Sequence, residues 1–459
     1  MVVDYKKKIK IENYLLVEII KLQNQSGENL FFKLMSPDIY AYILHILNQK
    51  IKYSKIKDSS HVITKLKYEI KTIKKNSYLV FLKSFFTKEK YLPPFFLKEK
   101  KAFTWVQNNL FKNYAYKKNI DLFQSRKYDW FPTPKKYKVK YNRKEFISII
   151  NLIQTVLLKI NKSISLDKND LNKIINDLSY LRFWSEKNIT YLRQRKVPKI
   201  FFAGTMRSAL NRVMSQVVNE NGGYTIVFEH GCGAGIVKDT GYIWDFLYAS
   251  KFISNKLAPG HPLSILKYFK NQNFLKENIK IEYSKNSLTK IKRKNKSNKI
   301  LKAVFVVTTT NENFFHIGPG MISVNQTTFI LNQLKEIFSS LNIELYVKLH
   351  PEQNSYKLIS YCNKNNIKTI GGYLKEMDMS DTIFVFENVT STSFYDLYLS
   401  EKPLIILHNP LIKFIYKAYL KIKKRATIYN LKYSGDQFYI NKLKLKKKIQ
   451  ELTTNYHEK

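Results

Sequence analysis

Strands that alternate with helices constrain the fold of this chain more than any other feature of its sequence. Short apolar stretches end in polar loops at 199–204, 224–228 and 246–253, and a helical pattern covers 208–218. The alternation returns with apolar stretches at 301–307, 343–349, 367–370, 383–386 and 404–407, and with helical patterns at 327–341 and 393–399. Strands separated by helices predict parallel sheets with crossover helices. We therefore expect an α/β fold with two Rossmann-like lobes.

The pattern divides the chain into five segments. Apolar residues before position 196 recur mostly at helical spacing, for instance over 146–158 and 165–177. Residues 284–299 are polar and basic, as expected of an interdomain linker. We predict a helical N-terminal region at 1–195, a first Rossmann-like lobe at 196–283, the linker at 284–299, a second Rossmann-like lobe at 300–412, and a basic helical tail at 413–459.

The charge of the chain favours a polyanionic partner. Its 459 residues include 79 Lys and Arg against 35 Asp and Glu, which gives a net charge of +44. A positive field of this size attracts nucleotides, anionic lipids, acidic glycans or nucleic acids. The sequence is also rich in Lys, Ile, Asn, Tyr and Phe together, the composition that an AT-rich genome produces. The charge therefore does not identify the partner.

The cellular location is expected to be the cytoplasm, at the inner face of the cytoplasmic membrane. Cys232 and Cys362 form no disulfide framework and no zinc motif. The first ten residues are charged and lack the apolar core of a signal peptide. The longest apolar stretch identified, 146–158, is too short to span a bilayer. We therefore expect a soluble protein or one bound to a membrane surface.

The first candidate motif is the loop EHGCGAG, which directly follows the strand at 224–228. Its glycines Gly231, Gly233 and Gly235 permit a close approach of the backbone to a phosphate. His230 is a candidate general base, with Glu229 beside it. The alternative is a tight turn with a structural histidine. The spacing differs from the dinucleotide fingerprint.

The second motif, KLHPE, also stands at the end of a strand. Lys348 and His350 offer an ammonium and an imidazole to a nucleotide phosphate, and Pro351 stops the strand. Thr308 and Thr309 follow the first strand of the same lobe. The alternative is a loop histidine followed by a turn proline.

The third motif, ENVTSTS, separates the strand at 383–386 from the next helix. Ser391, Thr392 and Ser393 are candidate anion-binding residues, because a helix N-terminus attracts anions, and Glu387 beside them is a further candidate for substrate binding. Simple N-capping by one hydroxyl is the alternative. Arg207 is a further candidate for a phosphate, or a surface residue.

Two aspartates complete the set of candidate polar residues. Asp239 and Asp245 are either carboxylate bases near His230 or solvated loop residues. No set of His, Asp or Glu has the spacing of metal ligands, so we expect neither metal nor cofactor.

These three motifs together resemble bacterial GT-B transferases of surface polysaccharide synthesis. The similarity covers 199–410 and is to enzymes with an HG motif in the first lobe and an HP motif in the second. Retaining Kdo transferases, polysialyltransferases and CDP-glycerol glycerophosphotransferases share this arrangement. The resemblance implies that His350, Ser391, Thr392 and Ser393 bind the donor phosphates, and that His230 faces the donor near the acceptor. Glu229 stands where several relatives have another residue.

The resulting hypothesis is a metal-independent glycosyltransferase that moves a sugar from a nucleotide-sugar to a growing capsule or lipopolysaccharide glycan. The expected partners are the nucleotide-sugar donor, a lipid-linked or polymeric glycan acceptor and an anionic membrane surface. Alternatives are a CDP-alditol glycerophosphotransferase of teichoic-acid type and a non-hydrolysing nucleotide-sugar 2-epimerase. Nucleic-acid binding is a remote alternative, because the basic residues lack a recognised nucleic-acid-binding motif. An inactive partner protein of the same fold also remains open.

Overall fold

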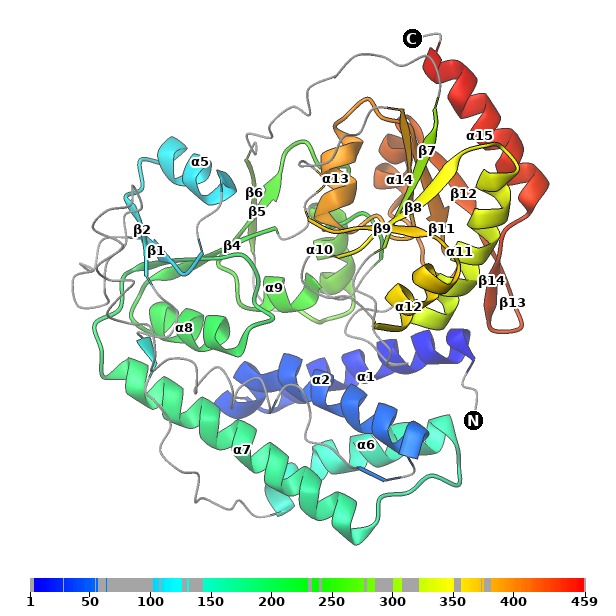
Figure 1. The fold of residues 1–459 in the computed structure, drawn as a ribbon. Helices are drawn as coiled ribbons and strands as arrows, with labels where there is room; N and C mark the ends of the chain where they lie inside the picture. Colours follow the sequence, from blue (N-terminus) through cyan, green and yellow to red (C-terminus); the bar gives the residue numbers. More distant parts are fainter. Residues whose placement is uncertain are drawn as a thin grey trace.

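The computed structural model of the chain describes residues 4–27, 29–53, 55–56, 63, 102–106, 109–125, 130–131, 143–229, 233–238, 242–275, 279–284, 300–307, 322–350, 356–372, 374 and 381–457. Within them the chain forms two six-stranded sheets, one two-stranded sheet and a layer of long helices (Figure 1). All neighbouring strands in the two larger sheets are parallel. The predicted fold class, two Rossmann-like lobes preceded by a largely helical region, is confirmed.

The first sheet has the strand order β2-β1-β3-β4-β5-β6. Its strands are β1 (Ala102–Thr104), β2 (Leu122–Gln124), β3 (Ile200–Ala203), β4 (Tyr224–Phe228), β5 (Lys251–Asn255) and β6 (Lys280–Ser284). β1 and β2 lie in the N-terminal region that was expected to be helical, so the first sheet draws on residues before position 196. At three residues each, these strands are too short to show an alternating pattern. Of the predicted linker, residues 285–299 lie outside the described residues.

The predicted strand at 246–253 is wrong over its first half. Ile243–Leu247 form the short helix α9, and β5 begins only at Lys251. Phe246 and Phe252 pack against each other with ring centroids 4.8 Å apart, so both elements face the same core. A short apolar run does not distinguish a buried helix from a buried strand.

The second sheet has the strand order β12-β11-β10-β7-β8-β9. Its strands are β7 (Lys302–Val306), β8 (Glu344–Lys348), β9 (Lys368–Ile370), β10 (Thr382–Phe386), β11 (Leu404–His408) and β12 (Thr427–Asn430). Counted within the lobe and read from β9, this is the Rossmann order 3-2-1-4-5-6. The order reverses between β7 and β10. In such sheets the ligand site lies beyond the carboxyl ends of the strands at this switch point.

The C-terminal tail is more than the helical segment that was expected. β12 completes the second sheet, and a hairpin follows from β13 (Lys432–Ser434) and β14 (Gln437–Tyr439). The helices of this segment are α14 (Tyr416–Lys423) and α15 (Lys442–His457). The tail is therefore part of the second lobe, and α15 packs against α11 (Val324–Ser339).

Alternate residues of the second sheet enter two different cores. Val304, Phe384 and Ile406 belong to a core that continues into the first lobe and the helical layer. Ala303, Val385 and Ile405 belong to a core that includes residues of α11, α12 (Tyr356–Lys364) and α15. Since successive side chains of a strand point to opposite faces, a fully apolar strand is covered on both sides. The remaining helices of the two lobes are α5 (Asn109–Lys117), α8 (Ala209–Glu220), α10 (Pro262–Asn271) and α13 (Thr392–Tyr398).

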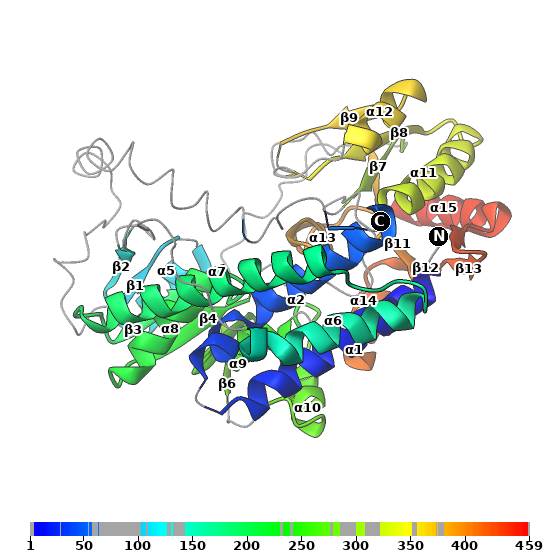
Figure 2. The same cartoon turned by 90° about the horizontal axis from the view of Figure 1, so that it is seen from below.

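A layer of helices underlies both lobes in the views of Figure 1 and Figure 2. It consists of α1 (Tyr5–Gln25), α2 (Leu30–Tyr53), α6 (Ile147–Ile160) and α7 (Lys168–Arg193), with a 3-10 turn, η4 (Arg143–Phe146), before α6. Among the described residues α2 alone is long and apolar enough to cross a membrane, but 78% of its apolar window is buried inside the protein. The expectation that 146–158 is the longest apolar stretch is therefore wrong. Core helices of soluble proteins have the same length and composition.

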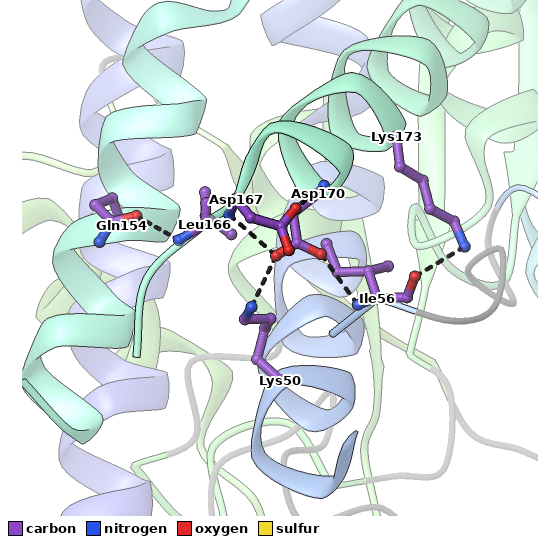
Figure 3. Close-up of polar contacts among 7 residues, drawn as sticks. All are labelled: Lys50, Ile56, Gln154, Leu166, Asp167, Asp170 and Lys173. Atoms are coloured by element: carbon purple, nitrogen blue, oxygen red, sulfur yellow. Dashed lines mark hydrogen bonds and ion pairs between the residues drawn. The ribbon is translucent and has the colours of Figure 1, made fainter. Parts of the chain in front are cut away.

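A buried ion pair joins two of these helices, as Figure 3 shows. Lys50, near the end of α2, lies 2.7 Å from Asp170 in the first turn of α7, and both side chains are at most 4% exposed. Asp170 also accepts a hydrogen bond from the Ile56 amide at 3.1 Å. It forms a capping box with Asp167, which begins the helix. One carboxylate therefore fixes both the start of α7 and the segment that follows α2.

The first helix anchors the N-terminal region to the second lobe. The Tyr5 amide donates to Asp436 Oδ1 at 2.8 Å, and the Tyr5 ring packs edge-on against Phe438. Asn409, directly after β11, donates to the Tyr5 hydroxyl at 3.4 Å. Burial, followed by the charge of Glu12, raises the pKa of Tyr5 well above its usual range. Residues more than 400 positions apart thus meet at the carboxyl end of β11.

Candidate functional site

The glycine-rich loop after β4 is held by the carboxylate of Glu229. Glu229 Oε1 accepts from the Ala234 amide at 2.8 Å, and Oε2 accepts from Ser254 Oγ at 2.6 Å and from the Asn255 amide at 3.1 Å. The side chain is buried, and this burial raises its pKa, although the three donors oppose the shift. Both carboxylate oxygens thus fasten the loop to the end of β5. His230 and Gly231 lie outside the described residues, and the catalytic role of Glu229 stays a prediction.

Gly235 is the point where this loop touches the next one. It has a φ of +75°, a conformation that side chains rarely adopt. A Cβ atom there would lie 2.3 Å from the carbonyl carbon of His261. The His261 amide donates to the Gly235 carbonyl at 3.0 Å. The glycine is therefore required for the close approach of two backbones.

The same loop reaches the second lobe. A Cβ atom on Gly233 would lie 2.8 Å from the Cβ of Thr390, in the loop that follows β10. Val237 and Phe414 form an isolated antiparallel bridge. Its hydrogen bonds run from the Lys238 amide to the Lys413 carbonyl and from the Ile415 amide to the Ile236 carbonyl, both at 2.8 Å. The first and third motifs, from different lobes, are therefore in contact.

The third motif caps α13 and lies beside the switch point. Ser391 is the N-cap, and its Oγ accepts from the Phe394 amide at 3.1 Å. Thr392 is exposed and Ser393 half-buried. Glu387, directly after β10, accepts from Thr327 of α11 at 3.3 Å. Ser391 thus performs the N-capping that the sequence left open, and the donor-binding roles of Glu387, Ser391, Thr392 and Ser393 stay predictions.

Arg425 completes the other end of α13. Its guanidinium donates to the carbonyls of Leu397 and Tyr398, both at 3.1 Å, and to that of Lys402 at 2.6 Å. A fourth carbonyl, that of Ser400, also accepts from it. The last carbonyls of a helix have no partner within the helix. A cation from the segment after α14 therefore fixes the orientation of the helix that begins at the third motif.

The second motif stands at the end of β8. Lys348 is 3% exposed, and its Nζ donates to the Leu349 carbonyl at 2.6 Å. The Leu349 amide donates to the Ile370 carbonyl of β9 at 3.0 Å. The next residue, His350, is half-buried. Lys348 thus brings a buried ammonium to the carboxyl edge of the sheet. Pro351, Thr308 and Thr309 lie outside the described residues.

The remaining predicted polar residues separate into exposed and buried positions. Arg207 is exposed in the loop after β3, where its amide donates to Thr205 Oγ1 at 3.2 Å. Asp245 is 2% exposed and accepts from the Met206 amide at 2.6 Å and from Thr205 Oγ1 at 3.0 Å. Its interpretation as a solvated loop residue is therefore wrong. Asp239 lies outside the described residues.

His408 is a strand-end residue that the sequence analysis missed. It is the last residue of β11, beside β10, and its ring stacks on Phe414 with centroids 4.3 Å apart. Burial lowers its pKa to about 4, so the ring is neutral at physiological pH. The sequence His408-Asn409-Pro410 repeats the pattern of a histidine and a nearby proline at a strand end. This pattern could have identified His408 as a candidate from the sequence. His408 thus lies between the carboxyl edge of the second sheet and the bridge to the first lobe.

The burial of His408 predicts a loss of stability in mild acid. Because the folded pKa lies below the ordinary value of 6.5, the unfolded chain binds the proton more tightly, and stability falls as pH decreases from 6.5 toward 4. Between pH 7.5 and 5.0 this residue is expected to cost about 1–2 kcal/mol, allowing for its partial exposure. Urea unfolding of wild type and His408→Phe at both pH values measures the difference. Equal acid sensitivity in the two proteins would contradict the prediction.

No group of three or more His, Cys, Asp or Glu within the described ranges is arranged to hold a metal ion. This finding covers only part of the chain, because His230, Cys232 and Asp239 are outside those ranges. The independence from metals and cofactors remains a prediction.

Comparison with known proteins gives matches among solved structures only, and these matches do not identify a function. No family model matches the sequence, and no curated protein sequence matches it. Similar solved structures include one described as a UDP-N-acetylglucosamine 2-epimerase of Listeria monocytogenes, with 11% identity and a TM-score of 0.38 over 79% of this chain and 90% of the other. Another is a UDP-glucosyltransferase of Polygonum tinctorium capable of glucosylating indoxyl, with 9% identity and a TM-score of 0.38 over 79% of this chain and 94% of the other. Identities and scores this low assign neither a family nor an activity to the chain.

Proposed function

We propose that the protein is a glycosyltransferase that moves a sugar from a nucleotide-sugar donor to a growing bacterial surface glycan. The observation that carries the proposal is the contact between loops at the carboxyl ends of both parallel sheets, Gly233 against Thr390 and Val237 paired with Phe414. Ligands of open parallel sheets bind beyond these strand ends. A molecule held by one lobe would therefore be presented to the other.

The donor side is proposed to be the second lobe. Its switch point lies between β7 and β10, where Glu387 is oriented by its hydrogen bond to Thr327. On the other side of β7, Lys348 is the last residue of β8, and His350 follows this strand. A cation and a hydrogen-bond donor at this edge suit the phosphates of a nucleotide. In the proposed reaction they neutralise the charge that develops on the leaving nucleotide, which requires no metal ion.

The first lobe is proposed to receive the acceptor beside His230. Glu229 would then act as a positioning residue, because both of its oxygens already hold the loop and the end of β5. This interpretation differs from a general base, which must accept a proton from the acceptor hydroxyl. His230 remains the proposed base.

A thermal-shift screen of the full chain against UDP, GDP, ADP, CMP and CDP tests the proposal. A nucleotide at about 100 times its Kd adds roughly 2.7 kcal/mol of stability, which corresponds to a rise in Tm of a few degrees. His350→Ala should raise the Kd about 10–100-fold, since it removes a hydrogen bond to a charged group. His45→Ala, in helix α2 of the helical layer, is the matched control and should retain the shift.

The outcome also separates the alternatives. A shift with UDP or GDP supports an ordinary sugar donor, and CMP supports Kdo or sialic acid. CDP alone would favour transfer of an alditol phosphate. A UDP-sugar that is epimerised without an acceptor would favour the 2-epimerase. If no nucleotide shifts the Tm of the wild-type protein, the transferase proposal is contradicted and an inactive partner is favoured.

A further inference from the structure

Helices α10 and α14 together form a mixed surface of lysines and exposed apolar side chains. On α14, Tyr416 is 71% exposed and Leu420 is 40% exposed, one helical turn apart. Lys417 and Lys421 are exposed on the adjacent positions of the same turns. Ala418 and Ile422, on the opposite face, are fully buried. The helix is therefore amphipathic, but its outer face carries large apolar groups among the charges.

The neighbouring helix α10 repeats the combination. Leu263 is 55% exposed and Lys267, one turn later, is also exposed. Figure 2 shows α10 and α14 on the same side of the molecule. Lys421 and Lys417 both lower the pKa of His261, after the larger effect of burial, so their charges lie close to the start of α10.

The two helices are held together by the junction between the lobes. His261, the N-cap of α10, bonds to Gly235, and the segment 236–238 pairs with 413–415 at the start of α14. The surface thus spans both lobes next to the contact on which the proposed function rests. The sequence from Lys402 to Gly435 contains no acidic residue, so α14 and its flanking segments supply no negative charge of their own.

We propose that this surface, Leu263 and Lys267 of α10 with Tyr416, Lys417, Leu420 and Lys421 of α14, docks the protein on an anionic lipid membrane. Lysines near a membrane surface are attracted by anionic headgroups, and Tyr and Leu insert at the boundary between headgroups and acyl chains. Nucleic acid is a weaker match, because isolated exposed leucines contribute nothing to phosphate contacts. Docking here places the junction of the two lobes close to the bilayer. A lipid-linked acceptor at that junction depends on the proposed function, whereas membrane binding itself does not.

Cosedimentation of the full chain with vesicles tests the proposal without any nucleotide. Wild type should bind vesicles of phosphatidylcholine with 30 mol% phosphatidylglycerol, and should bind pure phosphatidylcholine at least tenfold more weakly. K417E/K421E should lower the partition coefficient at least tenfold, since each lysine near the surface contributes about 1 kcal/mol. Y416S/L420S should lower it several-fold. Both variants change exposed positions, so the nucleotide-induced thermal shift should be unchanged and distinguishes this proposal from the proposed function.

Matched controls use exposed residues elsewhere in the second lobe. K444E/K447E on α15 makes the same change in net charge, and Tyr356→Ser with Leu443→Ser removes two apolar groups that are 87% and 82% exposed. These controls should bind like wild type. The proposal is overturned if the control pair on α15 loses as much binding as K417E/K421E, because the net charge alone would then explain it. It is also overturned if wild type does not bind anionic vesicles but binds single-stranded DNA at 150 mM salt, and if K417E/K421E abolishes this DNA binding.

Discussion

Asp170→Asn is expected to lower the free energy of unfolding by about 3–5 kcal/mol. The substitution keeps the shape of the side chain but leaves Lys50 without its carboxylate, and both groups are almost completely buried. An uncompensated charge in a protein interior is among the costliest single changes. It also weakens the capping box at the start of α7. Urea unfolding followed by circular dichroism measures the loss.

Two further variants separate the ion pair from its surroundings. Lys50→Met combined with Asp170→Asn removes both charges and should regain at least ~1 kcal/mol of the loss. Glu344→Gln breaks an ion pair between Glu344 and Lys368 that has the same N–O distance of 2.7 Å. The side chain of Glu344 is 48% exposed and that of Lys368 is 66% exposed. This control should leave stability unchanged within error, because water solvates the released charge. A comparable loss at both sites would show that burial is not the cause.

The sequence predicted the strands of the two sheets best where they are mostly apolar. Tyr224–Phe228 forms β4 as predicted, and Thr382–Phe386 differs by one residue from the predicted strand. Such strands are buried on both faces and flanked by turn residues, so their ends are marked in the sequence. The sequence did not predict the strands Ala102–Thr104 and Leu122–Gln124, because three residues are too few to show an alternating pattern. These strands form because β1 pairs with both β3 and β2.

The sequence predicted where the candidate site lies in the fold, but not which residues its side chains contact. A polar motif at the end of a buried strand must lie at the carboxyl edge of a parallel sheet. This rule predicted the positions of Glu229, Lys348 and Glu387. Which groups hold them depends on residues far away in the sequence, such as Ser254 for Glu229 and Thr327 for Glu387. The contact between Gly233 and Thr390 likewise follows from the packing of two lobes. Local patterns contain no information on such contacts.

Gly235→Ala is expected to cost roughly 2–5 kcal/mol and to disrupt the junction between the lobes. The residue has a φ of +75°, and its Cβ would overlap the His261 carbonyl at 2.3 Å. Backbone atoms cannot yield as a flexible side chain does, so one of the two loops must move. The next residues, Ile236 and Lys238, provide the hydrogen bonds to the second lobe. A displaced loop is therefore expected to weaken the contact between lobes and, with it, any nucleotide-induced rise in Tm.

Gly222→Ala separates strain from overlap in this experiment. Gly222 has nearly the same φ, +71°, but no atom lies within 4 Å of the position of its Cβ. It should therefore cost only the conformational penalty of about 1–2 kcal/mol and leave the junction intact. Urea unfolding of both variants gives the two free energies, and the thermal-shift screen reports on the site. Equal losses would mean that the His261 loop adapts to the extra methyl group. A larger loss in Gly235→Ala, together with a diminished nucleotide shift, would show that the close approach of these two loops joins the lobes into one site.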